Sequence, residues 1–117
     1  MILYGIPNCD TVRKARKFLE SNQTDYRFQD FRKTPVTLEI IQAWLKQHPI
    51  NVMVNKRSTG WKQLRETQQT ALMNGQQLTL LIENPTLIKR PVLQTQNHVL
   101  FGFNPKEYES ILKKSSI

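Results

Sequence analysis

The segment YGIPNCDTVRKARKFLE, residues 4–20, contains the passage from a strand into a helix that decides the fold. Residues 1–4 are apolar and are followed by Gly5, which predicts a buried strand that leads into a loop. From Asn8 onward, apolar residues recur at three- and four-residue spacing, which predicts an amphipathic helix with Asn8 as its cap. The chain's single cysteine, Cys9, therefore lies at the start of the first helix.

The rest of the chain continues this pattern of alternating strands and helices. The predicted elements are a strand at 25–31, a helix capped by Thr37 with Leu38, Ile41, Trp44 and Leu45 as its core face, an irregular loop at 51–60, short helices within 61–75 and 78–84, strands at 91–93 and 98–101, and a last helix capped by Asn104. A strand–helix–strand unit implies parallel pairing, and a short hairpin implies antiparallel pairing. The order therefore predicts an α/β fold with a mixed sheet.

Length and composition restrict the class of protein. A chain of 117 residues is the size of one domain, and its net charge of +8 favours anionic partners. No apolar run is long enough for a membrane helix, and the N-terminus lacks the features of a secretory signal, so we expect a cytoplasmic protein. One cysteine permits no internal disulfide, and the two histidines lie apart from acidic partners, so we predict no metal site.

The position of Cys9 predicts a reactive thiolate. Unpaired backbone amides and the helix dipole stabilise an anion at the first turn of a helix. The pKa of a thiol placed there falls, and the thiolate is the nucleophilic form. Asn8 and Thr11 are placed to donate supporting hydrogen bonds, although both residue types also serve as ordinary caps.

Three motifs together resemble the ArsC/Spx/YffB family, the arsenate-reductase-like branch of the thioredoxin superfamily. They are the segment 4–20, NKRSTGWKQL at 55–64 and LIKRPVL at 87–93, and the resemblance continues to GFNPKEYESIL at 102–112. The resemblance implies a single thioredoxin-like domain over residues 1–117, with a four-stranded mixed sheet. It also implies a helical insertion between the second and third strands, at about residues 35–86.

The resemblance also implies roles for individual residues. Cys9 corresponds to the nucleophile, and Arg57 and Arg90 correspond to arginines that line an anion pocket. A guanidinium suits that role because its planar fork can hold an oxyanion or a carboxylate through two hydrogen bonds. Pro91 corresponds to the cis proline of thioredoxin-like proteins, so we predict a cis bond between Arg90 and Pro91 and at no other position.

Two departures from the family pattern narrow the predicted function. Members that reduce arsenate have a third arginine shortly after the Arg-Pro pair, whereas residues 92–103 contain none. Members that regulate transcription usually have a second cysteine where this chain has Val12, which excludes a switch made by an internal disulfide. The YffB-like subgroup remains, and its resemblance implies a glutathione-dependent thiol reductase.

The predicted function is therefore that of a monothiol oxidoreductase without a bound cofactor. Cys9 would attack an electrophilic sulfur or an oxyanion of a small anionic or disulfide substrate, and glutathione or a glutaredoxin-type protein would resolve the intermediate. Three alternatives stay open: a non-enzymatic regulator that binds RNA polymerase, a true arsenate reductase, and a nucleic-acid binder suggested by net charge alone.

Overall fold

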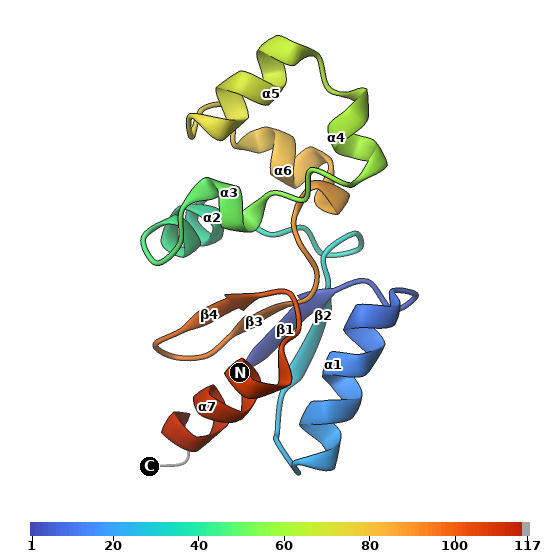
Figure 1. The fold of residues 1–117 in the computed structure, drawn as a ribbon, viewed down its shortest axis with the longest axis vertical. Coiled ribbons are helices and arrows are strands. Elements are labelled where there is room, and N and C mark those ends of the chain that lie inside the picture. Colours follow the sequence, from blue (N-terminus) through green and yellow to red (C-terminus); the bar gives the residue numbers. More distant parts are fainter. Residues whose placement is uncertain (116–117) are drawn as a thin grey trace. The chain divides into compact units, whose positions relative to one another are not determined.

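The computed structural model describes residues 1–115, which divide into two compact units. The first unit contains residues 1–34 together with the chain from residue 90 onward, and the second contains residues 35–89. Figure 1 shows the sheet and two helices in the first unit and only helical elements in the second. That the whole chain is one domain with an insertion at about 35–86 stays a prediction.

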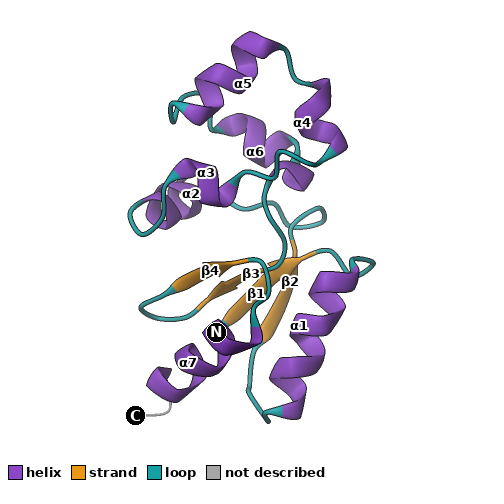
Figure 2. Ribbon diagram, in the orientation of Figure 1, coloured by secondary structure: helices purple, strands orange, loops and turns teal. Residues whose placement is uncertain are grey.

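The elements of the first unit follow the predicted order. They are β1 (Ile2–Gly5), α1 (Asp10–Ser21), β2 (Arg27–Asp30), β3 (Val92–Gln94), β4 (Val99–Phe101) and α7 (Pro105–Ser115). The strands form one sheet in the order β2-β1-β3-β4 (Figure 2). β1 pairs parallel with β2 and antiparallel with β3, and β3 pairs antiparallel with β4. The predicted mixed four-stranded sheet is confirmed.

The core of the first unit lies between one face of the sheet and the two helices α1 and α7. Leu3 is paired with Leu93 across β1 and β3, so the two side chains share a face, and both are fully buried. They pack with Ala15 and Leu19 of α1 and with Tyr108 of α7. The apolar residues whose spacing predicts α1 therefore include the residues that form its buried face.

Aromatic contacts join the two helices on this face. The rings of Phe18, Phe103 and Tyr108 meet edge to face, with centroids 4.9 to 6.0 Å apart. The Tyr108 hydroxyl donates to the carbonyl of Gly102 at 3.3 Å, and burial raises the pKa of this phenol. These contacts fix α7 to α1, although the two helices lie more than eighty positions apart in the sequence.

The start of α7 is the clearest agreement between sequence and structure. The side chain of Asn104 accepts hydrogen bonds from the backbone amides of Lys106 and Glu107 at 3.0 and 3.4 Å. Pro105 occupies the first helical position, where no backbone donor is needed. The predicted cap is therefore confirmed.

The second unit consists of short helical elements. They are α2 (Leu38–Leu45), α3 (Ile50–Met53), α4 (Thr59–Gln63), α5 (Glu66–Met73), α6 (Thr79–Glu83) and the 3-10 turn η1 (Pro85–Leu87). The Thr37 side chain accepts from the amide of Ile40 at 3.2 Å, so the predicted cap of α2 is confirmed. Ile41 and Trp44 of the predicted core face are buried. The prediction that Leu38 also belongs to this face is wrong, because Leu38 is 38% exposed.

The predicted irregular loop at 51–60 is wrong in part. Residues 50–53 form α3, and Val54 then pairs with Ile88 in an isolated antiparallel bridge. Met53 and Val54 are buried, and the amide of Asn55 donates to the carbonyl of Leu87 at 2.7 Å. This order comes from pairing with a segment more than thirty residues away, which local composition does not reveal.

Across the described residues, no helix has both the length and the apolar character needed to cross a lipid bilayer.

Candidate active site

Cys9 lies where the chain passes from β1 into α1. It occupies the N-cap position of the helix, with φ −104° and ψ 128°, and its side chain is half-buried. The predicted cap, Asn8, is one residue too early, because helical geometry begins at Asp10. Asp10 is the acidic residue of the first turn, and its carboxylate pairs with Arg13 at 2.6 Å.

A glycine at the end of β1 lets the first turn of α1 approach the strand closely. A Cβ at Gly5 would lie 2.8 Å from Cγ2 of Val12, which is well inside ordinary van der Waals contact. Val12 is fully buried, so its side chain cannot turn out into solvent. The absence of a side chain at Gly5 therefore lets Val12, in the first turn of α1, pack closely against the end of β1.

The surroundings of Cys9 favour its thiolate form. Burial by itself raises the pKa of the thiol, because desolvation disfavours the charged species. The backbone amide of Val12, the side chain of Arg90 and the backbone amide of Thr11 donate hydrogen bonds to the sulfur, and the charge of Arg90 adds to them. Their combined effect is larger than that of burial, so the pKa of Cys9 lies below the usual value for a thiol.

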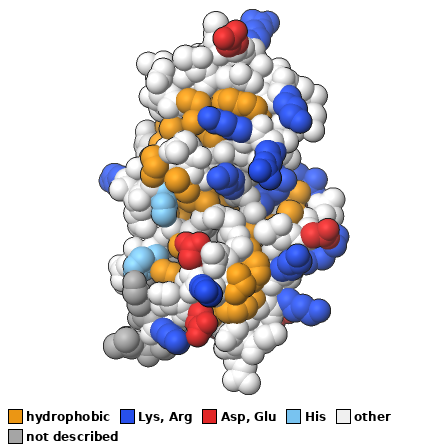
Figure 3. Space-filling model, in the orientation of Figure 1, with side chains coloured by type: hydrophobic (Ala, Val, Ile, Leu, Met, Phe, Trp, Pro, Cys, Tyr) orange, Lys and Arg blue, Asp and Glu red, His pale blue; other side chains and the backbone are white. Residues whose placement is uncertain are grey.

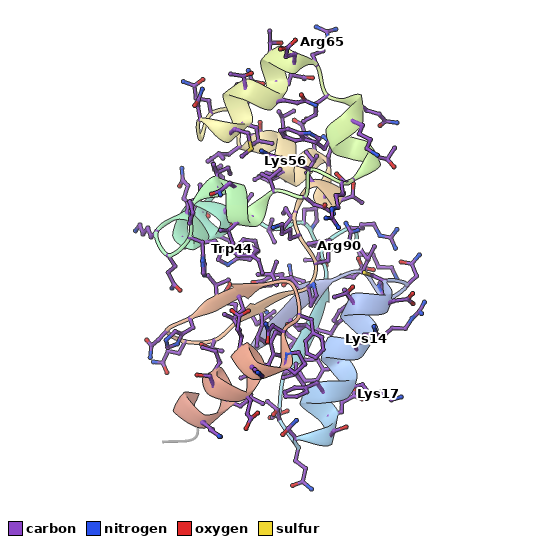
Figure 4. The ribbon with its side chains drawn as sticks, viewed as in Figure 1. Lys14, Lys17, Trp44, Lys56, Arg65 and Arg90 are labelled. Atoms are coloured by element: carbon purple, nitrogen blue, oxygen red, sulfur yellow. The ribbon has the colours of Figure 1, made fainter. Side chains whose placement is uncertain are left out.

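Sheet pairing explains how Arg90 reaches Cys9 from a distant part of the sequence. β3 runs antiparallel to β1, with Val92 opposite Tyr4, so the residues before β3 lie beside the end of β1. Arg90 is half-buried there, with its Nε atom enclosed, and Figure 4 shows it on the segment that leads into β3. The Arg90–Pro91 bond is cis, as predicted, and within the described chain it is the one cis bond.

The other predicted site residues have different positions. Thr11 contributes through its backbone amide, whereas the side chain of Asn8 accepts a hydrogen bond from Arg32 at 3.4 Å. Arg57 belongs to the second unit, where it is exposed on a turn and its backbone amide donates to Asn55 Oδ1 at 3.1 Å. Its role in an anion pocket stays a prediction.

Arg32 is not among the site residues that the sequence predicts. It follows β2 by two positions, as Asn8 follows β1 by three, and the two strands are parallel. The carboxyl ends of parallel strands lie at the same edge of a sheet. The short distance of each residue from the end of its strand could therefore have indicated that Arg32 lies near Asn8.

Basic side chains dominate the exposed surface of α1. Figure 3 shows Lys and Arg side chains gathered over this helix, and Figure 4 shows Lys14 and Lys17 pointing outward from it. Both lysines are exposed. An anionic reactant that approaches Cys9 therefore meets a positive field.

Comparison with known proteins shows which family has this sequence and fold. A family model described as "ArsC family" matches residues 4–111. This chain belongs to the ArsC family. The predicted recognition and the thioredoxin-like fold class are thereby confirmed.

Individual relatives of this ArsC-family chain differ in what their names state. A Haemophilus influenzae protein described as uncharacterized is 42% identical over 108 residues, which cover 92% of this chain and 95% of that protein. The Bacillus subtilis protein named "Regulatory protein MgsR" is 29% identical, over 100% of this chain and 94% of that protein.

Two solved structures have the same fold. The YFFB protein has a TM-score of 0.86 at 33% identity and covers 93% of this chain and 96% of its own. An arsenate reductase (ArsC) related protein from Brucella melitensis has a TM-score of 0.71 at 34% identity, over 96% and 93% of the two chains. The descriptions of these relatives thus name an arsenate-reductase-related protein and a regulatory protein.

The sulfur of Cys9 is half-buried at the start of α1. A pocket of about 680 Å³ lies instead where α1 ends, lined by Phe18, Thr24, Leu112 and neighbouring residues, and Cys9 does not line it. The twelve residues of α1 separate the two places by roughly 18 Å. Among the described residues, no three His, Cys, Asp or Glu side chains are grouped closely enough to hold a metal ion.

Proposed function

We propose that this ArsC-family chain is a cytoplasmic monothiol reductase that uses glutathione as co-substrate and has no bound cofactor. The observation that carries the proposal is the lowered pKa of Cys9, maintained by the first-turn amides of α1 and by Arg90. A half-buried sulfur at a helix start is accessible to a reactant, and its lowered pKa favours the nucleophilic thiolate. A cysteine that served only as packing would need neither property.

The proposed reaction on a glutathione mixed disulfide has two exchange steps. The Cys9 thiolate attacks the glutathione sulfur of the substrate, the substrate's S–S bond breaks, and the substrate leaves as a thiolate that takes a proton from water. Cys9 is then disulfide-bonded to glutathione. A second glutathione thiolate attacks this disulfide, releases oxidised glutathione and restores the Cys9 thiolate. Across the two steps one reduced glutathione is consumed, the substrate is released as a thiol, and the disulfide bond ends up in oxidised glutathione.

The arginines would serve binding as well as ionisation. Glutathione carries two carboxylates, and a guanidinium can hold a carboxylate through two parallel hydrogen bonds. Arg90 is at the sulfur, and we propose that Arg57 completes the anion site when substrate is bound. A glutaredoxin-type protein is the alternative reductant, and a small oxyanion is the alternative electrophile.

The test is mass spectrometry of the purified protein after mild oxidation in the presence of glutathione, followed by turnover coupled to glutathione reductase and NADPH. We expect an adduct of one glutathione on Cys9, weakened in Arg57→Ala and Arg90→Ala, and no turnover by Cys9→Ser. Wild-type protein that forms no adduct and consumes no NADPH would refute the proposal.

A non-enzymatic regulator is the second candidate function. It is supported by relatives named as regulators, among them MgsR and the Bacillus anthracis protein "Global transcriptional regulator Spx 2", which is 26% identical to this chain. Under this alternative, the chain would bind RNA polymerase, Cys9→Ser would retain full activity, and immobilised protein would retain the polymerase from purified components. Loss of binding in Cys9→Ser would count against it.

Arsenate reduction is the third candidate, supported by the Brucella neighbour whose description relates it to arsenate reductase. The segment 92–103 has no arginine to complete a set of three, so we expect little turnover of arsenate. Glutathione-dependent arsenate consumption at a rate similar to that of disulfide reduction would place the chain with the arsenate reductases.

A further inference from the structure

The end of the parallel strand pair brings a second arginine next to the reactive loop. β1 and β2 pair in register up to Gly5 and Asp30, and the amide of Phe31 still donates to the carbonyl of Gly5 at 3.2 Å. The chain therefore leaves both strands at the same edge. In open α/β sheets, ligands bind at this carboxyl edge.

Backbone hydrogen bonds hold the start of the Arg32 side chain in place. The Asp30 carboxylate accepts from the amide of Arg32 at 3.0 Å, and the Asp30 carbonyl accepts from the amides of Lys33 and Thr34 at 3.1 and 2.9 Å. The Asp30 carboxylate is thus bound to backbone rather than to the guanidinium. The Arg32 side chain is exposed, so its tip is open to a ligand.

The guanidinium of Arg32 differs from its neighbours in what it contacts. Arg13 is paired with Asp10, and Arg16 donates to Tyr26 and lies over the ring of Phe28. The described contact of the Arg32 guanidinium is with a neutral oxygen, Asn8 Oδ1, at 3.4 Å. A guanidinium has five N–H donors, and a carboxylate would accept from it more strongly than an amide oxygen at that distance.

We propose that Arg32 binds a carboxylate of glutathione during disulfide exchange at Cys9, and this inference rests on the proposed function. Asn8 precedes Cys9 directly, so its contact with Arg32 places the guanidinium against the residue next to the reacting cysteine. The two carboxylates of glutathione lie at the ends of the tripeptide, on either side of the cysteine that carries its sulfur. Arg90 bonds to the sulfur of Cys9, whereas Arg32 recognises the incoming tripeptide, so Arg32 determines which disulfide reacts rather than how strongly Cys9 is ionised.

The experiment compares two disulfides of opposite charge. Oxidised glutathione is anionic and cystamine is cationic, and each transfers one half to Cys9 in the same kind of exchange. Adduct formation is followed by mass spectrometry at 0.15 M salt for wild type, Arg32→Gln, Arg32→Lys and the control Arg27→Gln. Arg27 is an exposed arginine at the opposite end of β2, so its replacement removes the same charge away from Cys9.

We expect Arg32→Gln to slow the reaction with oxidised glutathione about fivefold, which is the effect of a well-placed exposed ion pair. The same variant should not slow the reaction with cystamine, and Arg32→Lys should lie between wild type and Arg32→Gln. Arg27→Gln should change either rate less than twofold. The alkylation pH profile of Cys9 should be unchanged in Arg32→Gln, because Arg32 is not among the groups that lower the pKa of Cys9.

Failure of the role of Arg32 and failure of the reductase proposal give different experimental results. Equal slowing by Arg32→Gln and Arg27→Gln, or equal slowing with both disulfides, would overturn the role of Arg32 and leave the reductase proposal intact. Wild-type protein that reacts with cystamine but not with oxidised glutathione would overturn both proposals.

Discussion

Replacing Gly5 by alanine should force the first turn of α1 away from β1, at the end of the helix that carries Cys9. The added Cβ would lie 2.8 Å from Cγ2 and 3.2 Å from Cγ1 of Val12. Both contacts are shorter than ordinary packing, and Val12 is a stiff, β-branched, fully buried residue. The strand or the helix must therefore shift by several tenths of an ångström.

We expect this overpacking to reduce the free energy of unfolding by about 2 kcal/mol, in the middle of the range for an extra methyl in a tight core. For a chain of this size, the melting temperature should fall by roughly 8 °C. The same shift moves the Val12 amide away from the sulfur. Because that amide lowers the pKa of Cys9, the pKa should rise in Gly5→Ala.

Urea unfolding followed by circular dichroism measures the first effect, and iodoacetamide alkylation against pH measures the second. The double variant Gly5→Ala, Val12→Ala provides the control. Val12→Ala alone should cost about 2 kcal/mol for two buried methyl groups, but it also clears the space for the new Cβ. The double variant should therefore be at least about 1 kcal/mol more stable than the sum of the single changes predicts. Additive costs, or a Gly5→Ala protein as stable as wild type, would refute the reasoning.

Three further predictions concern the site and the core. Arg90→Gln should raise the pKa of Cys9 and slow its alkylation near neutral pH, whereas the control Arg27→Gln should not; an unchanged alkylation profile in Arg90→Gln would contradict the hydrogen bond from Arg90 to the sulfur. Leu93→Ala removes a fully buried side chain from the middle of the sheet and should cost about 3 kcal/mol in urea unfolding. Leu38→Ala, at a position 38% exposed, should cost less than about 0.5 kcal/mol, and similar losses in these two variants would count against the described core. Because the pKa of Cys9 is lower in the folded chain than in the unfolded chain, the unfolded state holds more protons between the two pKa values. The stability of wild type relative to Cys9→Ser should therefore rise with pH from the folded pKa to the ordinary thiol pKa, and a difference that stays constant over that range would show that the thiolate is not stabilised by folding.

Features that depend on neighbouring residues could be predicted from the sequence. The caps at Thr37 and Asn104 were correct because a side-chain oxygen reaches an amide only two or three residues ahead. The apolar spacing from Asn8 onward predicts an amphipathic helix, and the buried residues of α1 follow that spacing because a helix packs one face against the core. The cis bond at Pro91 was predicted from the family resemblance rather than from the local residues.

Features that depend on strand pairing could not be predicted in this way. The sequence predicts an irregular loop at residues 51–60, but part of this segment is ordered by α3 and by the bridge between Val54 and Ile88. The sequence predicts Asn8 as the cap of α1, whereas Cys9 occupies that position and the Asn8 side chain accepts a hydrogen bond from Arg32.

The sequence by itself determined that one cysteine begins an amphipathic helix after a buried strand, because both patterns are local and periodic. The tertiary structure decided which charged groups meet that cysteine. Arg90 reaches the sulfur because β3 runs antiparallel to β1, and Arg32 reaches Asn8 because β2 runs parallel to it. Strand pairing joins residues that are distant in the chain, so the chemistry of Cys9 depends on the sheet as much as on the helix.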